Sequence, residues 1–181
     1  YCPPYTLLKD FFNKVKKSRI SIGAQNCHAN SDFGPFTGSI NSKLIKSTGA
    51  KYVIIGHSDN RNQGDNDKNI NNKIKSALNE NLKVIFCVGE KLNEKKKNLT
   101  YSILKKQIVK GLDKINNFEN IIIAYEPVWS IGTGLVPKSS ELKKNINNIK
   151  KILSLLRKSK KINILYGGSV SPDNAKNLLE M

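Results

Sequence analysis

The chain has 181 residues, of which 38% are hydrophobic and 25% are charged. A chain of this size can form one domain with a hydrophobic core over residues 1–181, and no apolar run is long enough to cross a bilayer. The formal net charge is +17, from 31 Lys and Arg residues against 14 Asp and Glu residues, which leaves a basic nucleic-acid-binding module as an alternative class of function.

The basic residues do not follow the pattern of a nucleic-acid site. Only Arg19, Arg61 and Arg157 are arginines, and the lysines are spread over every predicted helix without interleaved aromatic residues. A surface of hydrated lysines is the favoured interpretation, so we expect neither a nucleic-acid nor a membrane partner. The cysteines are 3 in number and lack C-x-x-C spacing, which predicts reduced thiols in a cytoplasmic protein and no metal site.

Apolar runs rich in Ile and Val alternate with helical patterns along the chain. In chain order, the predicted elements are a helix over 5–17, a strand over 20–25, a helix over about 39–48, strands over 51–56 and 83–88, a helix over 98–116, a strand over 121–126, a helix over 139–159 and a strand over 162–167. The strands begin roughly 30 to 40 residues apart, about the length of a βα unit. Short continuous apolar strands are typical of a parallel sheet that is buried on both faces.

The predicted helices carry their own start and stop signals. Apolar residues recur at intervals of three and four in 98–116 and 139–159, as expected for one buried helix face. Gly49 predicts the end of the helix over 39–48, and Ser171-Pro172 predicts an N-cap followed by the first residue of another helix.

Alternating strands and helices predict an α/β fold with right-handed crossovers. The pattern is compatible with a doubly wound open sheet and with a βα barrel, and periodicity does not choose between them. No G-x-G-x-x-G or G-x-x-x-x-G-K-[ST] motif follows a strand. The absence of these motifs argues against dinucleotide and P-loop sites.

Polar residues follow the predicted strands, at the edge where α/β folds bind ligands. Glu126 comes directly after an apolar run, and partial desolvation of its carboxylate would favour a role as a base near neutral pH. A strand-end acid paired with a lysine is the alternative. His57, followed by Ser58 and Asp59, is either a structural histidine in an ion network with Asp59 and Arg61 or a neutral donor to a substrate carbonyl.

Two glycine-containing segments complete this edge. The segment 129-WSIGTGLVP-137 predicts either an ordinary βα loop or a hinged lid. The turn 167-GGS-169, before a capped helix, is either a tight connection or a set of backbone N–H groups suited to a phosphate.

Taken together, the motifs resemble those of the triosephosphate isomerase family. The matching runs are 23-GAQN-26, 36-FTG-38, 53-VIIGHS-58, 124-AYEPVW-129, 131-IGTG-134 and 166-YGGSV-170, and they occur in the family's order over essentially the whole chain. The resemblance implies a TIM barrel that interconverts dihydroxyacetone phosphate and D-glyceraldehyde 3-phosphate in glycolysis and gluconeogenesis. It implies a cytoplasmic homodimer with no metal or organic cofactor.

The resemblance also implies roles for particular residues. Glu126 would be the base that moves a proton between adjacent carbons, and His57 the neutral electrophile that polarises the carbonyl. Gly132 and Ser169 would donate backbone hydrogen bonds to the substrate phosphate, and the 129–137 loop would be a lid that excludes water.

Other residues would support these roles. Ser58 and Asp59 come with the histidine motif, and Gly167 and Gly168 come with the phosphate-binding turn. The segment 33-FGPFTG-38 resembles the loop that enters the neighbouring subunit in dimers of this family.

The chain departs from the family pattern at its ends and near His57. A family barrel has about eight βα units and about 250 residues. Here the sequence shows five whole strands and, at 1-YCPP-4, the tail of another. We therefore expect an incomplete barrel, from about the end of strand 2 to helix 7, without the N-x-K strand and the last Gly-Gly strand. Asp59 and Asp65 stand where the family has glutamates.

An incomplete barrel would expose strand edges, so the isolated chain is expected to be unstable or aggregating, with little isomerase activity. Two other interpretations stay open besides the nucleic-acid module. One is a catalytically inactive truncated remnant, and the other is a phosphate-binding βα barrel with a different reaction.

Overall fold

The computed structural model of the chain describes residues 1–156 and 162–180. Within these ranges one sheet of 5 parallel strands has the order β1-β2-β3-β4-β5. The strands are β1 (Gly23–Ala24), β2 (Tyr52–Ile55), β3 (Lys83–Val88), β4 (Ile121–Tyr125) and β5 (Ile164–Tyr166). All the predicted strands are therefore present. The outer two are shorter than predicted.

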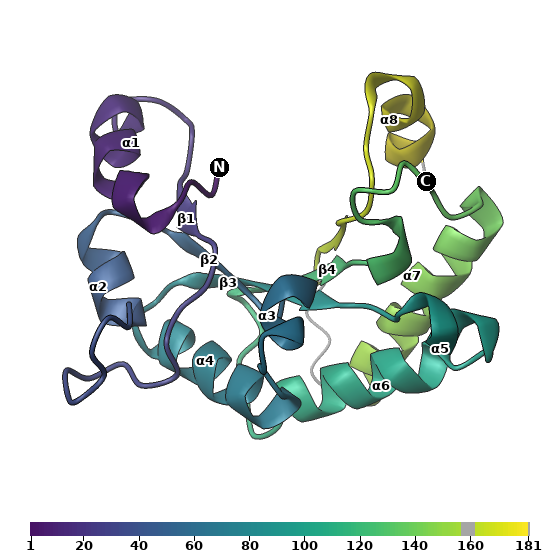
Figure 1. Cartoon of the computed structure of the whole chain (residues 1–181), viewed down its shortest axis with the longest axis horizontal. Coiled ribbons are helices and arrows are strands. Elements are labelled where there is room, and N and C mark those ends of the chain that lie inside the picture. Colours follow the sequence, from purple (N-terminus) through teal and green to yellow (C-terminus); the bar gives the residue numbers. More distant parts are fainter. Residues whose placement is uncertain (157–161, 181) are drawn as a thin grey trace.

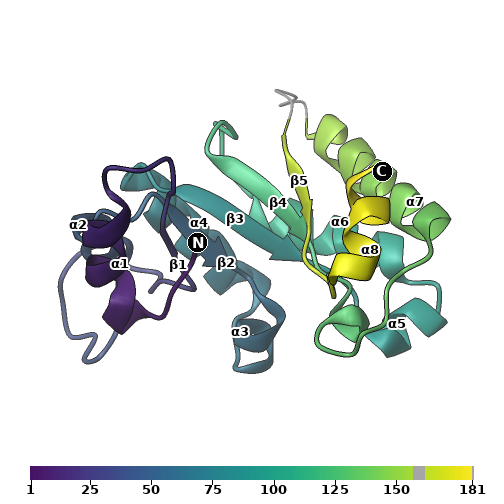
Figure 2. The same cartoon turned by 90° about the horizontal axis from the view of Figure 1, so that it is seen from above.

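The strand order decides between the two architectures that the sequence left open. Each strand pairs with the strand that precedes it in the chain, so the sheet grows in one direction without a reversal. A doubly wound sheet would reverse at a switch point. Figures 1 and 2 show the strands as a curved sheet that is covered by helices on its outer side, which is the arrangement of part of a βα barrel.

The helices connect successive strands. In chain order they are the 3₁₀ turn η1 (Tyr5–Leu7), α1 (Leu8–Val15), α2 (Ser42–Ser47), α3 (Ser58–Asn62), α4 (Asp67–Asn79), α5 (Leu92–Lys96), α6 (Thr100–Gly111), the 3₁₀ turn η2 (Val128–Ser130), α7 (Ser139–Leu155) and α8 (Pro172–Leu179). The prediction gave bounds for neither α4 nor the short helices α3 and α5.

The core lies between the sheet and the helices beneath it in Figure 1, α4 and α6. Alternate residues of the strands face these helices. Val84 and Phe86 of β3 are fully buried there, as are Ile74 of α4 and Ile108 of α6. Burying one such side chain contributes about 2–3 kcal/mol. A Cβ on Gly111 of α6 would clash with the Phe86 ring, so a glycine lets α6 approach β3 closely.

Several predicted helix ends are confirmed, and others are displaced. Gly49 has φ +94° after α2, and Ser171 forms a capping box before Pro172 of α8. The helix predicted over 98–116 ends earlier, at Gly111. Lys114 has φ +56°, and the buried Asn71 side chain donates hydrogen bonds to the carbonyls of Gly111 (2.9 Å) and Asp113 (3.0 Å).

Three other predictions differ from the structure in extent. The helix predicted over 139–159 ends at Leu155, and residues 157–159 lie outside the described part of the chain. The helix predicted over 39–48 starts at Ser42, because the Asn41 side chain accepts from Leu44 N at 2.8 Å and caps it. The helix predicted over 5–17 divides into η1 and α1.

The segment predicted as a strand tail, 1-YCPP-4, is not a regular strand but lies beside β1. The Tyr1 amino group donates to Ser21 O at 2.8 Å, and Gly23 N donates to Tyr1 O at 2.9 Å. These hydrogen bonds hold the segment against the edge of the sheet.

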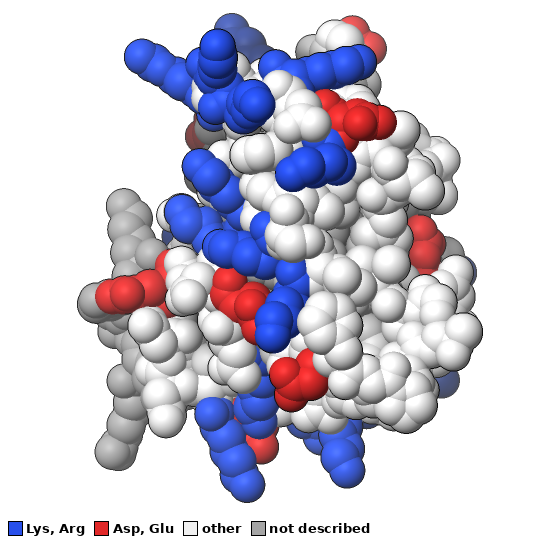
Figure 3. Space-filling view, turned by 90° about the vertical axis from the view of Figure 1, so that its left-hand side faces the viewer, with Lys and Arg blue, Asp and Glu red and all other residues white. Residues whose placement is uncertain are grey.

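Lysine side chains project over the face that carries α1 and α2, with acidic side chains among them (Figure 3). Among the described residues, no helix is both long enough and apolar enough to cross a membrane.

Candidate active site

The parallel sheet brings the carboxyl ends of its strands to one edge. His57 lies two residues after β2, Glu90 two residues after β3, and Glu126 directly after β4. His57 Nε2 lies 3.6 Å from Glu126 Oε1, although 69 positions separate the two residues in the sequence. The structure thus brings together the two side chains that the sequence predicted as catalytic.

The local fold fixes which nitrogen of His57 carries a proton when the ring is neutral. His57 is the N-cap of α3, and its Nδ1 accepts a hydrogen bond from Asp59 N at 3.2 Å. Because Nδ1 must present a lone pair to this N–H, the neutral ring carries its proton on Nε2, on the side of Glu126. The Asp59 carboxylate also lies 3.4 Å from Nδ1, but its side chain is 77% exposed, so water screens this contact.

Glu126 is buried, with several polar groups near its carboxylate. Its residue is 7% exposed, and desolvation by burial raises the pKa of its carboxyl group. The nearby His57 ring, the Cys87 thiol, the Ser58 backbone N–H and Arg61 oppose this shift. A carboxylate whose pKa is raised by dehydration is a stronger base than an exposed one, which suits proton abstraction near neutral pH.

Close packing around Glu126 and Tyr166 requires glycine at positions 167 and 168. A Cβ on Gly167 would lie 2.7 Å from Glu126 Cγ, and a Cβ on Gly168 would clash with the Tyr166 hydroxyl. Gly167 N also donates to Tyr125 O at 2.9 Å. The turn after β5 therefore forms one wall around the Glu126 side chain.

The loop 129–137 is tied to the turn after β5 through Ser130. Ser169 N donates to Ser130 O at 3.2 Å, and Ser130 Oγ lies 3.0 Å from the Tyr166 hydroxyl. Ser130 Oγ also donates to Leu135 O. Gly132 has φ +66° and nothing within 4 Å of the position of a Cβ. The structure joins Ser169 to the start of the loop, while Gly132 has open space on the side where a Cβ would lie.

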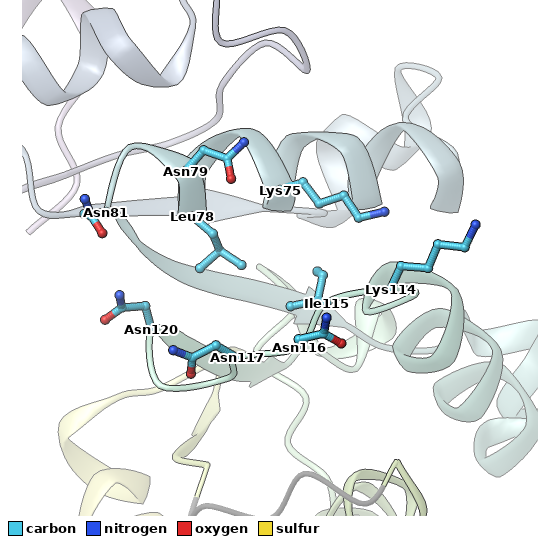
Figure 4. Close-up of a pocket in the computed structure, with 9 residues that line it drawn as sticks. All are labelled: Lys75, Leu78, Asn79, Asn81, Lys114, Ile115, Asn116, Asn117 and Asn120. Atoms are coloured by element: carbon cyan, nitrogen blue, oxygen red, sulfur yellow. The ribbon is translucent and has the colours of Figure 1, made fainter.

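Two cavities lie at opposite ends of the strands. A cavity of about 530 Å³ is lined by His57, Asp59 and Gln25, among others. Another of about 380 Å³ lies between Asn81, which precedes β3, and Asn120, which precedes β4 (Figure 4). Ligands of α/β barrels bind at the carboxyl ends of the strands, where the cavity beside His57 lies. Glu126 does not line this cavity, so the approach of His57 to Glu126, and not the cavity, marks the candidate substrate site.

Sequence reasoning did not select Glu90, which is fully buried. Its carboxylate accepts from Trp129 Nε1 at 2.9 Å and from the Tyr125 hydroxyl at 3.2 Å, and Asn145 Nδ2 donates to that hydroxyl at 2.8 Å. Desolvation raises the Glu90 pKa. Glu90 lies two residues after its strand, as His57 does, so its position alone could have indicated a functional residue. Its hydrogen bond to the Trp129 indole, however, is evident only from the structure.

Of the ion network considered for His57, only the approach of Asp59 is present, at 3.4 Å, and Arg61 does not join it. Arg61 Nη1 pairs with Asp67 Oδ1 at 2.9 Å, and its Nε donates to Gly56 O at 2.8 Å. Asp65 pairs with Lys73 at 2.6 Å. Arg61 thus holds the carboxyl end of β2 in place through its hydrogen bond to Gly56 O, while Asp59 stays exposed.

Within residues 1–156 and 162–180, no group of three or more His, Cys, Asp or Glu side chains could hold a metal ion.

Sequentially ordered parallel strands, with a histidine facing a buried carboxylate at their carboxyl ends, define an enzyme of the βα-barrel class. A family model described as Triosephosphate isomerase matches residues 1–181. The chain belongs to the triosephosphate isomerase family, and its function is that of this isomerase family. The family prediction and the barrel prediction are both confirmed.

Individual relatives agree with the family model. The triosephosphate isomerase of Endomicrobium trichonymphae is 40% identical over 99% of this chain and 73% of that protein. That of Dictyoglomus thermophilum is 42% identical over 98% of this chain and 74% of that protein. The crystal structure of triosephosphate isomerase from Bartonella henselae has a TM-score of 0.91 at 38% identity, over 99% of this chain and 73% of that one.

Proposed function

We propose that His57 and Glu126 carry the interconversion of dihydroxyacetone phosphate and D-glyceraldehyde 3-phosphate in this chain. The observation that carries this proposal is the approach of His57 Nε2 to within 3.6 Å of Glu126 Oε1 at the carboxyl ends of β2 and β4. This separation is slightly too long for a hydrogen bond, so the Nε2–H group is available to a substrate oxygen.

The geometry supports a proton transfer between adjacent carbons. The Glu126 carboxylate removes a proton from the hydroxyl-bearing carbon, and the electron pair of that C–H bond forms the C=C bond of an enediolate. The carbonyl electrons move onto oxygen, where the His57 Nε2–H group donates a hydrogen bond. The proton of the hydroxyl group moves to this oxyanion, a transfer that His57 Nε2 can relay, so the first carbon–oxygen bond becomes the new carbonyl. Protonated Glu126 returns its proton to the neighbouring carbon, which gives the isomer without a net change in atoms or charge.

The substrate phosphate would bind to backbone N–H groups of Gly132 and Ser169. Ser169 N now donates to Ser130 O at 3.2 Å, so phosphate binding requires this bond to be exchanged. Loop 129–137 would then move over the substrate as a lid and exclude water from the enediolate. Ser58, through its backbone N–H, and Gly167 and Gly168, through their lack of a side chain, support the position of the base.

A homodimer through 33-FGPFTG-38 is the proposed assembly. The Phe33 residue is 69% exposed, and Lys43 Nζ lies 5.6 Å from the centroid of its ring. An apolar ring projecting from a loop is suited to a cavity on a second copy. Phe33→Ser should shift the monomer–dimer equilibrium toward monomer in sedimentation velocity, and an unchanged equilibrium would contradict this interface.

The proposed setting is the cytoplasm, and nucleic acid is not a proposed partner. The dispersed lysines of Figure 3 support this view, because acidic side chains interrupt them. Binding of a DNA duplex should be weak, indifferent to sequence and lost on adding salt. Tight binding that discriminates between sequences would instead favour a nucleic-acid module.

The test of the reaction is Glu126→Gln in the 181-residue chain, assayed for triose phosphate interconversion. Loss of a general base should lower the rate by about 100- to 10,000-fold. Glu80→Gln is the matched control, since Glu80 follows α4 and precedes β3, at the opposite end of the strands from His57. If Glu126→Gln keeps the activity, a barrel with a different catalytic pair is the better interpretation. A parent chain without activity would agree with the low activity expected of an incomplete barrel, and it would leave an inactive member of the fold as the alternative.

A further inference from the structure

The segment 88–90, at the end of β3, holds both Glu126 and the start of the lid. Glu126 N donates to Val88 O at 2.8 Å, and Val128 N donates to Glu90 O at 3.0 Å. Trp129 Nε1 donates to the Glu90 carboxylate at 2.9 Å. The backbone of the base and the hinge of loop 129–137 are therefore set by the position of three residues that do not touch the substrate site.

This segment needs an anchor of its own. The ladder between β3 and β4 pairs residues up to Val88 and Tyr125, so the backbone groups of Gly89 lie beyond the last paired position. A Cβ on Gly89 would clash with the Glu126 carbonyl, which shows how closely the two strand ends approach. A small shift of Gly89 would consequently be transmitted to Glu126.

The anchor is the side chain of Gln107. Gly89 N donates to Gln107 Oε1 at 2.8 Å, and Gln107 Nε2 donates to Gly89 O at 3.0 Å. One amide thus satisfies both backbone groups of a single residue, which fixes its orientation as well as its position. Gln107 lies on α6, where Leu104 and Ile108 are fully buried against the sheet, so the amide itself is held by the core.

We propose that Gln107 is a positioning residue that holds segment 88–90 and, through it, the base Glu126 and the hinge at Trp129. The inference rests on the proposed role of Glu126. Its functional consequence is that the helix on the outer side of the barrel controls the alignment of the carboxylate on the inner side.

The test replaces Gln107 with methionine. Methionine has a similar length and a similar helix propensity, so Gln107→Met removes both hydrogen bonds without weakening α6. Asn71→Leu is the matched control. Asn71 is also a side-chain amide with two hydrogen bonds to backbone carbonyls at α6, those of Gly111 and Asp113, but it has no connection to segment 88–90.

Two measurements on the 181-residue chain decide the outcome. The first is amide hydrogen exchange at Glu126 and Val128, measured relative to the amides of β2. The second is acrylamide quenching of the fluorescence of Trp129, the single tryptophan of the sequence. Gln107→Met should speed exchange at both amides by about ten-fold and increase quenching by about two-fold, while Asn71→Leu changes neither relative to β2.

The inference is overturned if exchange changes only at Gly89, or if both variants behave alike, because Gln107 would then be merely structural. In the isomerase assay, Gln107→Met should lower kcat with little change in KM, since it misaligns the base without removing a substrate contact. An inactive parent chain would agree with the low activity expected of an incomplete barrel, whereas the exchange and quenching results still decide the role of Gln107.

Discussion

Gly167→Ala displaces the proposed base without changing its chemistry. The new Cβ would lie 2.7 Å from Glu126 Cγ and 3.3 Å from Oε1. Ordinary van der Waals contact begins at 3.4 Å, so the Glu126 side chain must move by up to about 0.7 Å. Because a misplacement of about 1 Å can cost about 100-fold in rate, we expect kcat/KM to fall by about ten-fold, or about 1.4 kcal/mol in activation free energy.

The assay compares kcat/KM for triose phosphate interconversion with the affinity for a phosphorylated carboxylate that mimics the enediolate. The analogue should lose affinity in parallel, because it depends on the same alignment. Gly64→Ala serves as a control for stability, since Gly64 has φ +112° and open space around it. If folded Gly167→Ala keeps both values within about two-fold of the parent, the position of Glu126 does not limit the reaction and the reasoning fails.

Three other outcomes follow from the site. Nitrogen NMR should show neutral His57 with its proton on Nε2, and a proton on Nδ1 would contradict the hydrogen bond from Asp59 N. Burial raises the pKa of Glu126 in the folded chain, so its contribution to stability is greatest in acid and is lost as pH rises from the unfolded to the folded pKa. Glu126→Gln should therefore raise the urea midpoint at neutral pH but not in acid, and a gain that is independent of pH would refute this. Ser130→Ala removes the hydroxyl that donates to Leu135 O, which should lower the local stability of the loop by about 1 kcal/mol. Proteolysis within 131–138 should then be about five-fold faster. An unchanged cleavage rate would show that this hydrogen bond does not restrain the loop.

The predicted bounds of the elements agree with the structure where one local pattern dominates. Continuous Ile and Val runs identified β3 and β4 almost to the residue, because these strands have neighbours on both sides and are buried. The strand predicted over 20–25 shrinks to Gly23–Ala24 at the edge of the sheet. The helix predicted over 98–116 ends at Gly111, because Asn71, 40 positions away in sequence, caps its carbonyls.

The candidate site shows the same division. His57 and Glu126 stand out as polar residues at strand ends, and the structure brings them to 3.6 Å. Glu90 has the same kind of position, but its role depends on Trp129 and Tyr125, which lie on another strand end. Gln107 lies in the middle of a helix, and nothing in its neighbours in the sequence indicates that its amide faces Gly89.

By itself, the sequence determined the strands, the alternation of β and α, and the polar residues that follow each strand, because hydrophobic periodicity and turn chemistry are local properties. The tertiary structure decided the sequential strand order, the approach of His57 to Glu126 and the indole partner of Glu90. These depend on which distant groups come within a few ångströms of one another. The apolar run before Glu126 indicated its desolvation, but the groups that approach Glu126 and Glu90 come from other strand ends, so no local stretch of the chain identifies them.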